Sequence, residues 1–261
     1  MPAAPRRSRL IAALAACAGL WPAAAAAEVQ GTACPGPGAA EILLAPEALA
    51  GLDAAPPGAI TVTGAYTAAA PDLRADGHPR PVGLFIHRGR SVTPDLARMD
   101  GLLIVAADGT ARIVTTAAAP MGGALHDLRR LSERRAFARA AAELGASVLQ
   151  SHLLIRDGRL DLRPVEGAPR APRRLLLADA DGRLSLWRAR RPVTLHEAAV
   201  EALAAQAPTM ALNLDTGSFD FCERMGPAGP APCGLLMREG AARLSNLLRL
   251  HARPVCARDA G

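Results

Sequence analysis

Apolar and polar residues alternate most regularly between residues 210 and 215. The apolar positions are Met210, Leu212 and Leu214, and the positions between them hold Ala211, Asn213 and Asp215. A period of two predicts a strand with one apolar face. The strand ends at Thr216-Gly217-Ser218, small residues that allow a tight turn and the close approach of a ligand. The stretch predicts a carboxylate presented at a sheet edge. The plainer interpretation is an ordinary turn that Asp215 caps.

Other strands are predicted where short apolar runs are bounded by turn residues. Residues 60–66 and 82–87 are two such runs, and three Asp-Gly dipeptides each separate a pair of further runs: Asp108-Gly109, Asp157-Gly158 and Asp181-Gly182. Both central positions of a type I′ turn need positive φ, so Asp-Gly between two such runs predicts a hairpin. A series of hairpins favours strand pairing that is largely antiparallel or mixed.

Three stretches predict helices. Residues 127–144 have Asp127 as an N-cap and Gly145 as a stop. Thr194 and Glu197 form a capping box that opens a helix to about residue 206, and a last helix is expected over about 240–251. Roughly seven or eight strands against two or three packed helices predict an α+β domain with a mixed, largely antiparallel sheet, not a parallel doubly wound one.

The first residues predict a signal peptide over residues 1–27. Arg6, Arg7 and Arg9 precede an apolar run that is too short to span a bilayer comfortably, and small residues follow up to Ala27. The chain is therefore expected to be periplasmic or secreted. The alternative is an envelope protein that is lipid-anchored at Cys17, because residues 14–17 also match a lipoprotein box.

The remaining chain is expected to form one domain. Residues 28–58 are rich in proline and glycine and predict an irregular lead-in, followed by a single domain over 59–261. Roughly 235 mature residues suffice for one sizeable core. The formal net charge of +6 includes three arginines in residues 1–26, a stretch without acids, which leaves 6 − 3 = +3. A charge this small and dispersed gives no reason to expect a nucleic-acid partner.

Four of the five cysteines follow the predicted signal peptide. An even number in an exported chain predicts two disulfides, and three pairings are possible. Cys222–Cys233 would close a short loop and Cys34–Cys256 would tie the two ends together, and this pairing is preferred. Metal binding is the competing interpretation, but no Cys-x-x-Cys or Cys/His cluster supports it. No metal or other cofactor is expected.

Several segments, taken in order over roughly residues 60–220, resemble one protein family. They are Thr63-Gly64-Ala65-Tyr66, Pro81 to Ile86 with Gly89, Leu149 to Gly158, Pro172-Arg173 before an Asp-Gly hairpin, Thr194 to Ala199, and Ala211 to Gly217. The third is similar to the family's Q-S-x-P-L-L-I-x-x-G segment and the last to its A-L-N-L-D-G-G segment. The chain thus resembles a divergent member of the phosphodiester glycosidase-like family, which includes the enzyme that uncovers mannose 6-phosphate by removing N-acetylglucosamine.

The resemblance implies hydrolysis of a sugar-1-phosphate diester at the sugar carbon. A phosphomonoester is a good leaving group, so the site needs charge neutralisation from an arginine and a carboxylate that steers water or stabilises an oxocarbenium-like centre. We expect Asp215 to be this carboxylate and Arg173 to bind the phosphate. The expected contacts to a carbohydrate or sugar-phosphate ligand are Gln150, Ser151, Asn213 and Gly217. The plainer interpretations are a solvated Arg173 and a polar strand start at Gln150-Ser151.

The chain also departs from the family pattern at positions where small residues are usual. Thr216 and Leu177 stand at glycine positions, His152 stands at another, and Phe219 replaces a small polar residue. Added side chains fill space that a substrate would use. The alternative function is therefore a catalytically degenerate carbohydrate-binding or envelope scaffold protein of the same fold.

Overall fold

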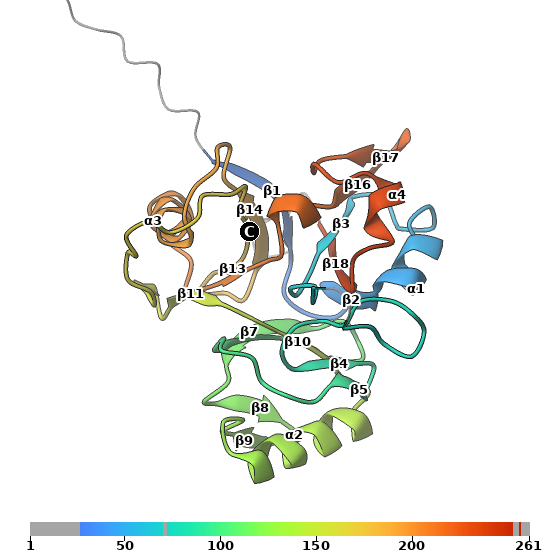
Figure 1. Cartoon of the computed structure of the whole chain (residues 1–261), viewed down its shortest axis with the longest axis vertical. Helices are drawn as coiled ribbons and strands as arrows, with labels where there is room; N and C mark the ends of the chain where they lie inside the picture. Colours follow the sequence, from blue (N-terminus) through green and yellow to red (C-terminus); the bar gives the residue numbers. More distant parts are fainter. Residues whose placement is uncertain (1–26, 70–71, 253–255, 257–261) are drawn as a thin grey trace, which may run out of the picture.

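The computed structural model describes residues 27–69, 72–252 and 256 of the 261-residue chain. In this part of the chain the strands form three larger sheets, which occupy three sectors of the molecule, and a two-stranded ribbon (Figure 1). Every pairing between named strands is antiparallel, so the predicted α+β class and largely antiparallel pairing are confirmed. Residues 1–26 of the predicted signal peptide, which include Cys17, lie outside the described residues.

The first sheet has the strand order β1–β14–β13–β15–β11–β12. These strands are β1 (Glu28–Ala33), β14 (Leu184–Arg188), β13 (Arg174–Ala178), β15 (Met210–Asn213), β11 (Leu153–Arg156) and β12 (Arg159–Leu160). Helix α3 (Leu195–Gln206) covers one face of this sheet through three buried alanines. The Thr194–Glu197 capping box is present, so the predicted start of this helix is confirmed. Two of the predicted Asp-Gly hairpins join β11 to β12 and β13 to β14.

The second sheet has the order β5–β4–β10–β6–β7, and helix α2 (Leu131–Glu143) packs against it. Its strands are β5 (Arg90–Thr93), β4 (Phe85–His87), β10 (Ser147–Ser151), β6 (Gly101–Val105) and β7 (Ala111–Thr115). The remaining Asp-Gly dipeptide, Asp108-Gly109, joins β6 to β7 as predicted. The ribbon of β8 (Ala119–Met121) and β9 (Ala124–His126) lies beside α2 (Figure 1). Only His152 separates β10 from β11, so the chain passes directly from the second sheet into the first.

The third sheet has the order β17–β16–β3–β18–β2. Its strands are β17 (Gly229–Pro232), β16 (Cys222–Gly226), β3 (Ala59–Thr63), β18 (Asn246–His251) and β2 (Ala40–Leu44). The short helices α1 (Ala45–Ala50) and α4 (Arg238–Ala241) lie against it, and the 3-10 turn η1 (Gly217–Phe219) leads into it. Apolar residues from all three sheets meet in one central core.

Three predictions about secondary structure are wrong. Asp127 is not the N-cap of the first long helix, because α2 begins at Leu131 after the N-cap Arg130. Residues 28–58 are not an irregular lead-in, because β1, β2 and α1 lie there and both strands join sheets. Residues 240–251 are not a helix: α4 ends at Ala241 and Asn246–His251 is strand β18. β18 lies between β3 and β2 and hydrogen-bonds to both. Pairing on both edges therefore overrides the helical preference of its leucine- and arginine-rich sequence.

Both preferred disulfides are present. Cys34 pairs with Cys256 across 222 residues, and Cys222 pairs with Cys233 across 11. Stable disulfides belong to oxidising compartments, which indicates an extracytoplasmic location. Among the described helices, none combines the length and the apolar character that crossing a bilayer requires.

Candidate functional site

Asp215 lies just beyond the end of β15, where the first sheet meets the chain that follows β3. The Leu214 N–H donates to Arg174 O (3.0 Å), and the Asp215 N–H donates to Gly64 O (3.0 Å). The carboxylate oxygen Oδ2 accepts a hydrogen bond from the Thr67 N–H at 3.0 Å. Gly64 leaves room for this junction, because a Cβ there would lie 2.3 Å from Asn246 Oδ1. The sequence pattern predicts the strand and the turn, and two peptide groups from the chain after β3 then hold the Asp215 backbone and its carboxylate in place.

Burial controls the charge of Asp215. The residue is only 5% exposed, and burial raises the pKa of its carboxyl to about 6, against smaller opposing effects of hydrogen bonds from Thr67 and Thr216. Within the described part of the chain no cation lies at ion-pair distance from Asp215. A buried carboxyl without a counter-charge titrates close to neutral pH, which suits a group that exchanges protons.

Tyr66 and Asn213 form a hydrogen-bonded pair beside Asp215. Asn213 Nδ2 donates to the Tyr66 hydroxyl oxygen and to Leu214 O (3.0 Å), and the Asn213 side chain is fully buried. Burial, and then the nearby Asp215 charge, raise the pKa of Tyr66 to about 12. The phenol therefore stays protonated, and because its oxygen accepts from Asn213, its own hydrogen is free to donate. Tyr66 was in the family-like segments but was not among the predicted site residues.

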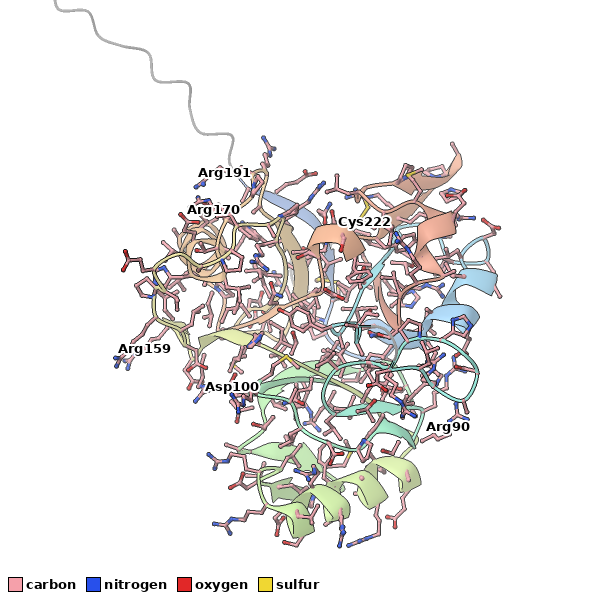
Figure 2. The ribbon with its side chains drawn as sticks, in the orientation of Figure 1. Arg90, Asp100, Arg159, Arg170, Arg191 and Cys222 are labelled. Carbon is pink, nitrogen blue, oxygen red and sulfur yellow. A yellow bond between two sulfur atoms is a disulfide. The ribbon has the colours of Figure 1, made fainter. Side chains whose placement is uncertain are left out.

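His152 connects this pair to a group of charged residues. Its ring meets the ring of Tyr66 edge-on, with 5.7 Å between centroids. Burial lowers the pKa of His152, Asp100 opposes this shift and Arg173 adds to it. Asp100 lies at the edge of the junction between the first two sheets (Figure 2), where Arg156 Nη2 donates to its Oδ2 at 2.6 Å. His152 was noted in the sequence only as a departure from a glycine, and nothing in the spacing of the histidines pointed to it.

Arg173 precedes β13 on the same face of the sheet as Asn213. The register pairs Leu175 with Asn213, and Arg173 lies two residues before Leu175, on the same side of the chain. Side chains directly opposite each other share a face. Arg173 is partly buried, and its Nε and Nη2 donate to Val193 O (3.2 Å) and Pro169 O (3.0 Å). Burial lowers the pKa of Arg173, and the neighbouring Tyr66 opposes this shift.

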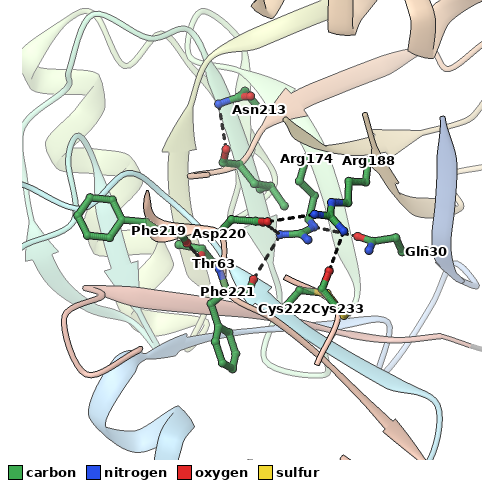
Figure 3. A network of polar contacts seen from close by, with 11 residues as sticks. Gln30, Thr63, Arg174, Arg188, Asn213, Phe219, Asp220, Phe221, Cys222 and Cys233 are labelled. Atoms are coloured by element: carbon green, nitrogen blue, oxygen red, sulfur yellow. Dashed lines mark hydrogen bonds and ion pairs between the residues drawn. A yellow bond between two sulfur atoms is a disulfide. The ribbon is translucent and has the colours of Figure 1, made fainter. Parts of the chain in front are cut away.

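Arg174, the next residue, faces the other side of β13 and is fully buried. Its Nη1 donates to Asp220 Oδ1, and its Nε donates to Gln30 Oε1 on β1 at 2.9 Å (Figure 3). Arg188 of β14 adds a second cation, 3.6 Å from Asp220 Oδ2. Burial lowers the pKa of Arg174, and Asp220 opposes this shift. This group, which we call the Arg174 network, joins the first sheet to the segment that follows η1.

Gln150 was predicted to contact the substrate, but its side chain is used within the fold. It is fully buried in β10, and its Oε1 accepts from the N–H groups of Leu84 (2.9 Å) and Ala97 (3.0 Å). Its Nε2 donates to Ala97 O (3.1 Å) and to Met99 O. Gly83, at φ +82°, makes room for this amide, because a Cβ there would lie 2.4 Å from Gln150 Oε1. All its hydrogen-bonding groups hold Leu84, before β4, and the loop of Ala97 and Met99, after β5, so we leave Gln150 out of the candidate site.

Ser151 and Gly217 are the other two predicted ligands. Ser151 is fully buried and its hydroxyl donates to Asn213 O, so it supports the strand end instead of facing a ligand, and we leave it out as well. Gly217 is partly exposed at φ +74°, and no atom lies within 4 Å of where its Cβ would be. Phe219 packs against the apolar cluster beneath α1 and α4. The space beside Gly217 therefore stays open.

The site that remains joins Asp215, Asn213, Arg173, Tyr66 and His152 from four separate stretches of chain. It presents a carboxyl that titrates near pH 6, a protonated phenol, an imidazole and a guanidinium. Among the described residues, no group of three or more histidine, cysteine or acidic side chains is placed to hold a metal ion. The set can hydrogen-bond hydroxyl groups, bind an anion and transfer a proton.

No protein-family model and no curated protein matches the sequence. Similar solved structures include the catalytic domain of zebrafish N-acetylglucosamine-1-phosphodiester alpha-N-acetylglucosaminidase, auto-inhibited by its pro-peptide, at 16% identity and a TM-score of 0.49, covering 85% of this chain and 73% of that one. A protein described as exported, from Burkholderia pseudomallei, is similar at 16% identity and a TM-score of 0.47, covering 86% and 71%. A hypothetical protein from Synechocystis is similar at 14% identity and 0.40, covering 85% and 56%. The family that the sequence motifs resemble is thus among the similar structures, but similarity at this level does not establish an activity.

Proposed function

We propose that the protein is an exported hydrolase that cleaves a sugar-1-phosphate diester, or a related envelope glycan, at the sugar carbon. The observation that supports this most directly is the state of Asp215. It is a buried carboxyl with a pKa of about 6 and no cationic partner among the described residues, and its charge acts on Tyr66 together with that of Arg173, which has no carboxylate partner there. Unpaired charges of this kind lower stability and are concentrated at functional sites.

In the proposed reaction a water molecule attacks the anomeric carbon of the sugar. The bond between this carbon and the phosphate oxygen breaks, and its electron pair stays on the phosphate, which leaves as a monoester. Ionised Asp215 accepts the proton of the attacking water, and Arg173 stabilises the negative charge of the phosphate. The Tyr66 hydroxyl, oriented by Asn213, donates a hydrogen bond to a sugar or phosphate oxygen.

The proposed base role sets the pH dependence. Only the ionised carboxylate accepts a proton, so kcat/KM is expected to rise as the pH passes through about 6, the pKa of Asp215. A rate that instead falls over this range would assign Asp215 the role of an acid.

The test is release of free sugar from a synthetic sugar-1-phosphate diester by the purified protein and by Asp215→Asn. The substitution keeps the shape and removes the base, so we expect kcat/KM to fall by at least about 10²-fold. Asp95→Asn is the matched control, because that carboxylate side chain is 82% exposed and lies in the loop after β5. Equal rates for Asp215→Asn and the unmodified protein would remove Asp215 from the mechanism.

The second candidate is a carbohydrate-binding protein of the same fold without turnover. It is favoured by how little of the site reaches solvent: Asp215 is 5% exposed, Asn213 is fully buried, and Thr216 stands beside them where the family has a glycine. This protein would bind a glycan saturably and release no sugar. A glycan titration on the same preparation separates the two functions.

For location, we propose a periplasmic or secreted protein, with lipid anchoring at Cys17 as the alternative. Mass spectrometry of the mature N-terminus decides between them. A chain that begins near residue 28 carries no anchor, whereas one that begins at a lipidated Cys17 is attached to the envelope.

A further inference from the structure

A cavity of about 340 Å³ lies beside the start of α3, and Arg173 lines it. The other walls come from residues 162–169 and from the first residues of the helix. The lining is mostly apolar: Leu162, Val165, Ala168, Pro169 and Leu195. Val165 lines the cavity and is 70% exposed. Covering this apolar side chain with an apolar ligand group would be favourable, because it removes apolar surface from water. A pocket with this lining favours an apolar ligand group.

The charged residues of this cavity are arginines. Arg163 and Arg173 both line it, and no acidic residue does. Neither guanidinium forms an ion pair with a described residue, and Arg163 has no hydrogen bond to one either. Arg173 donates to two carbonyl groups through Nε and Nη2, which leaves Nη1 without a described acceptor. The cavity therefore combines apolar walls with positive charge that the protein does not neutralise, and a ligand with an anionic group beside an apolar one complements both.

Arg173 belongs to the cavity and also to the candidate site. Its charge affects the pKa values of Tyr66 and His152, and the charge of Asp215 acts on the same Tyr66 hydroxyl. A phosphate bound to this guanidinium has the site with Asp215 on one side and the apolar cavity on the other. Of the two groups esterified to a phosphodiester, one is the sugar that Asp215 acts on, and the other is directed to the cavity.

We propose that this cavity binds an apolar alkyl or aryl group carried by the phosphate, so that the substrate is a sugar joined through phosphate to an apolar aglycone. This inference rests on the proposed function and adds the class of the leaving group. Hydrolysis then yields free sugar and an alkyl or aryl phosphate monoester. Such monoesters cannot react further at the sugar carbon, so their binding to the cavity can be measured without catalysis.

The first experiment measures binding of inorganic phosphate, butyl phosphate, octyl phosphate and neutral octyl glucoside by isothermal titration calorimetry, below the critical micelle concentrations. Each buried methylene contributes about fourfold in affinity, the equivalent of about 0.8 kcal/mol. We expect octyl phosphate to bind at least about tenfold tighter than butyl phosphate, because two of its four added methylenes suffice for this. Equal affinity for the two phosphates, or octyl glucoside binding as tightly as octyl phosphate, would overturn the proposal.

The second experiment places a carboxylate at the cavity by Val165→Glu. The matched control is Val200→Glu, which changes a 41% exposed valine of α3 that does not line the cavity. Val165→Glu is expected to weaken octyl phosphate binding by about tenfold or more through repulsion of the phosphate and loss of the apolar wall, with Val200→Glu unchanged. Circular dichroism of both variants shows that they fold. A folded Val165→Glu protein that binds octyl phosphate normally would contradict the assignment.

Turnover separates this proposal from the proposed function. If sugar-1-phosphate diesters with methyl and octyl aglycones are hydrolysed with equal kcat/KM, the proposed hydrolase function is supported and the proposal that the cavity binds the aglycone is wrong. If neither diester is hydrolysed but octyl phosphate still binds in a Val165-dependent manner, the hydrolase fails and the cavity remains a site for apolar phosphates. Preference for the octyl diester supports both.

Discussion

Arg173 and Arg174 are neighbours in the chain, yet their guanidinium groups meet different surroundings on the two faces of β13. Arg174 is fully buried and is paired with Asp220, Gln30 and the Phe221 carbonyl. Arg173 is partly buried and bonds only to carbonyl groups, and Asp215, whose charge acts on Tyr66 as that of Arg173 does, has no cationic partner in the described chain. Each face thus has an arginine and an aspartate, but the two charges are paired on one face only.

The comparison separates a structural use of charge from a functional one. In the Arg174 network each charge offsets the desolvation of the other, so removing one leaves an uncompensated buried ion. In the candidate site Asp215 is desolvated without such compensation, and its pKa rises to about 6 as a result. The first arrangement joins two sheets. The second leaves a carboxyl and a guanidinium without a counter-charge, which lowers the stability of the fold.

The largest effect is expected in the Arg174 network. Asp220→Asn keeps the side-chain volume but leaves Arg174 buried without a counter-charge, which should lower the free energy of unfolding by about 3–5 kcal/mol. Urea denaturation followed by far-UV circular dichroism measures the loss. The control is Asp53→Asn, because the exposed pair Asp53–Arg238 should contribute less than about 1 kcal/mol. Similar losses for the two variants would show that the network is no more important than a surface pair.

Asp215→Asn should instead raise the free energy of unfolding at neutral and higher pH. A rise of about two pKa units, from 3.8 to about 6, makes the ionised carboxylate destabilising by up to about 3 kcal/mol. The folded state binds the proton more tightly than the unfolded state, so this contribution is absent below pH 3.8 and grows as the pH rises to about 6 and beyond. Asp215→Asn should therefore be more stable than the unmodified protein at pH 8 and nearly equal to it at pH 4.

Urea denaturation of both proteins across this pH range measures the difference, and Asp95→Asn shows what an exposed carboxylate contributes. If Asp215→Asn proves less stable at pH 8, the carboxylate is stabilised by its surroundings. The contrast with Asp220 would then disappear.

The smallest effect on stability is expected at Arg173. Arg173→Gln removes two charge-assisted hydrogen bonds from a partly exposed side chain, and amide donors replace them in part, so the loss should be about 1 kcal/mol. Affinity for octyl phosphate should nevertheless fall by about tenfold or more, because the phosphate loses its cation. For Arg174→Gln, at the adjacent residue, we expect a large loss in the free energy of unfolding. Equal stability losses for the two variants would mean that both arginines are structural.

Much of the local structure could be predicted because its causes lie within a few residues. The three Asp-Gly turns, the Thr194–Glu197 capping box and the alternation that ends at Asp215 each act over short distances, and all of them are present in the fold. The two disulfides follow from an even number of cysteines and from two loops that can close. The candidate carboxylate and its arginine were found in the same way, from a strand end and a family-like segment. Their roles stay predictions.

The sequence by itself determined where the chain turns, which strands form hairpins and which aspartate ends a strand, because these depend on local backbone preferences and side-chain period. Tertiary structure decided that 246–251 is a strand between two others and that 28–58 supplies strands to two sheets, because pairing partners over 150 residues away outweigh local preference. It also decided that Gln150 is locked into the fold, that Tyr66 and His152 join Asp215, and that Arg173 and Arg174 face opposite sides. Alternation along a strand separates those two arginines, but only the packed sheets determine which of them meets a carboxylate.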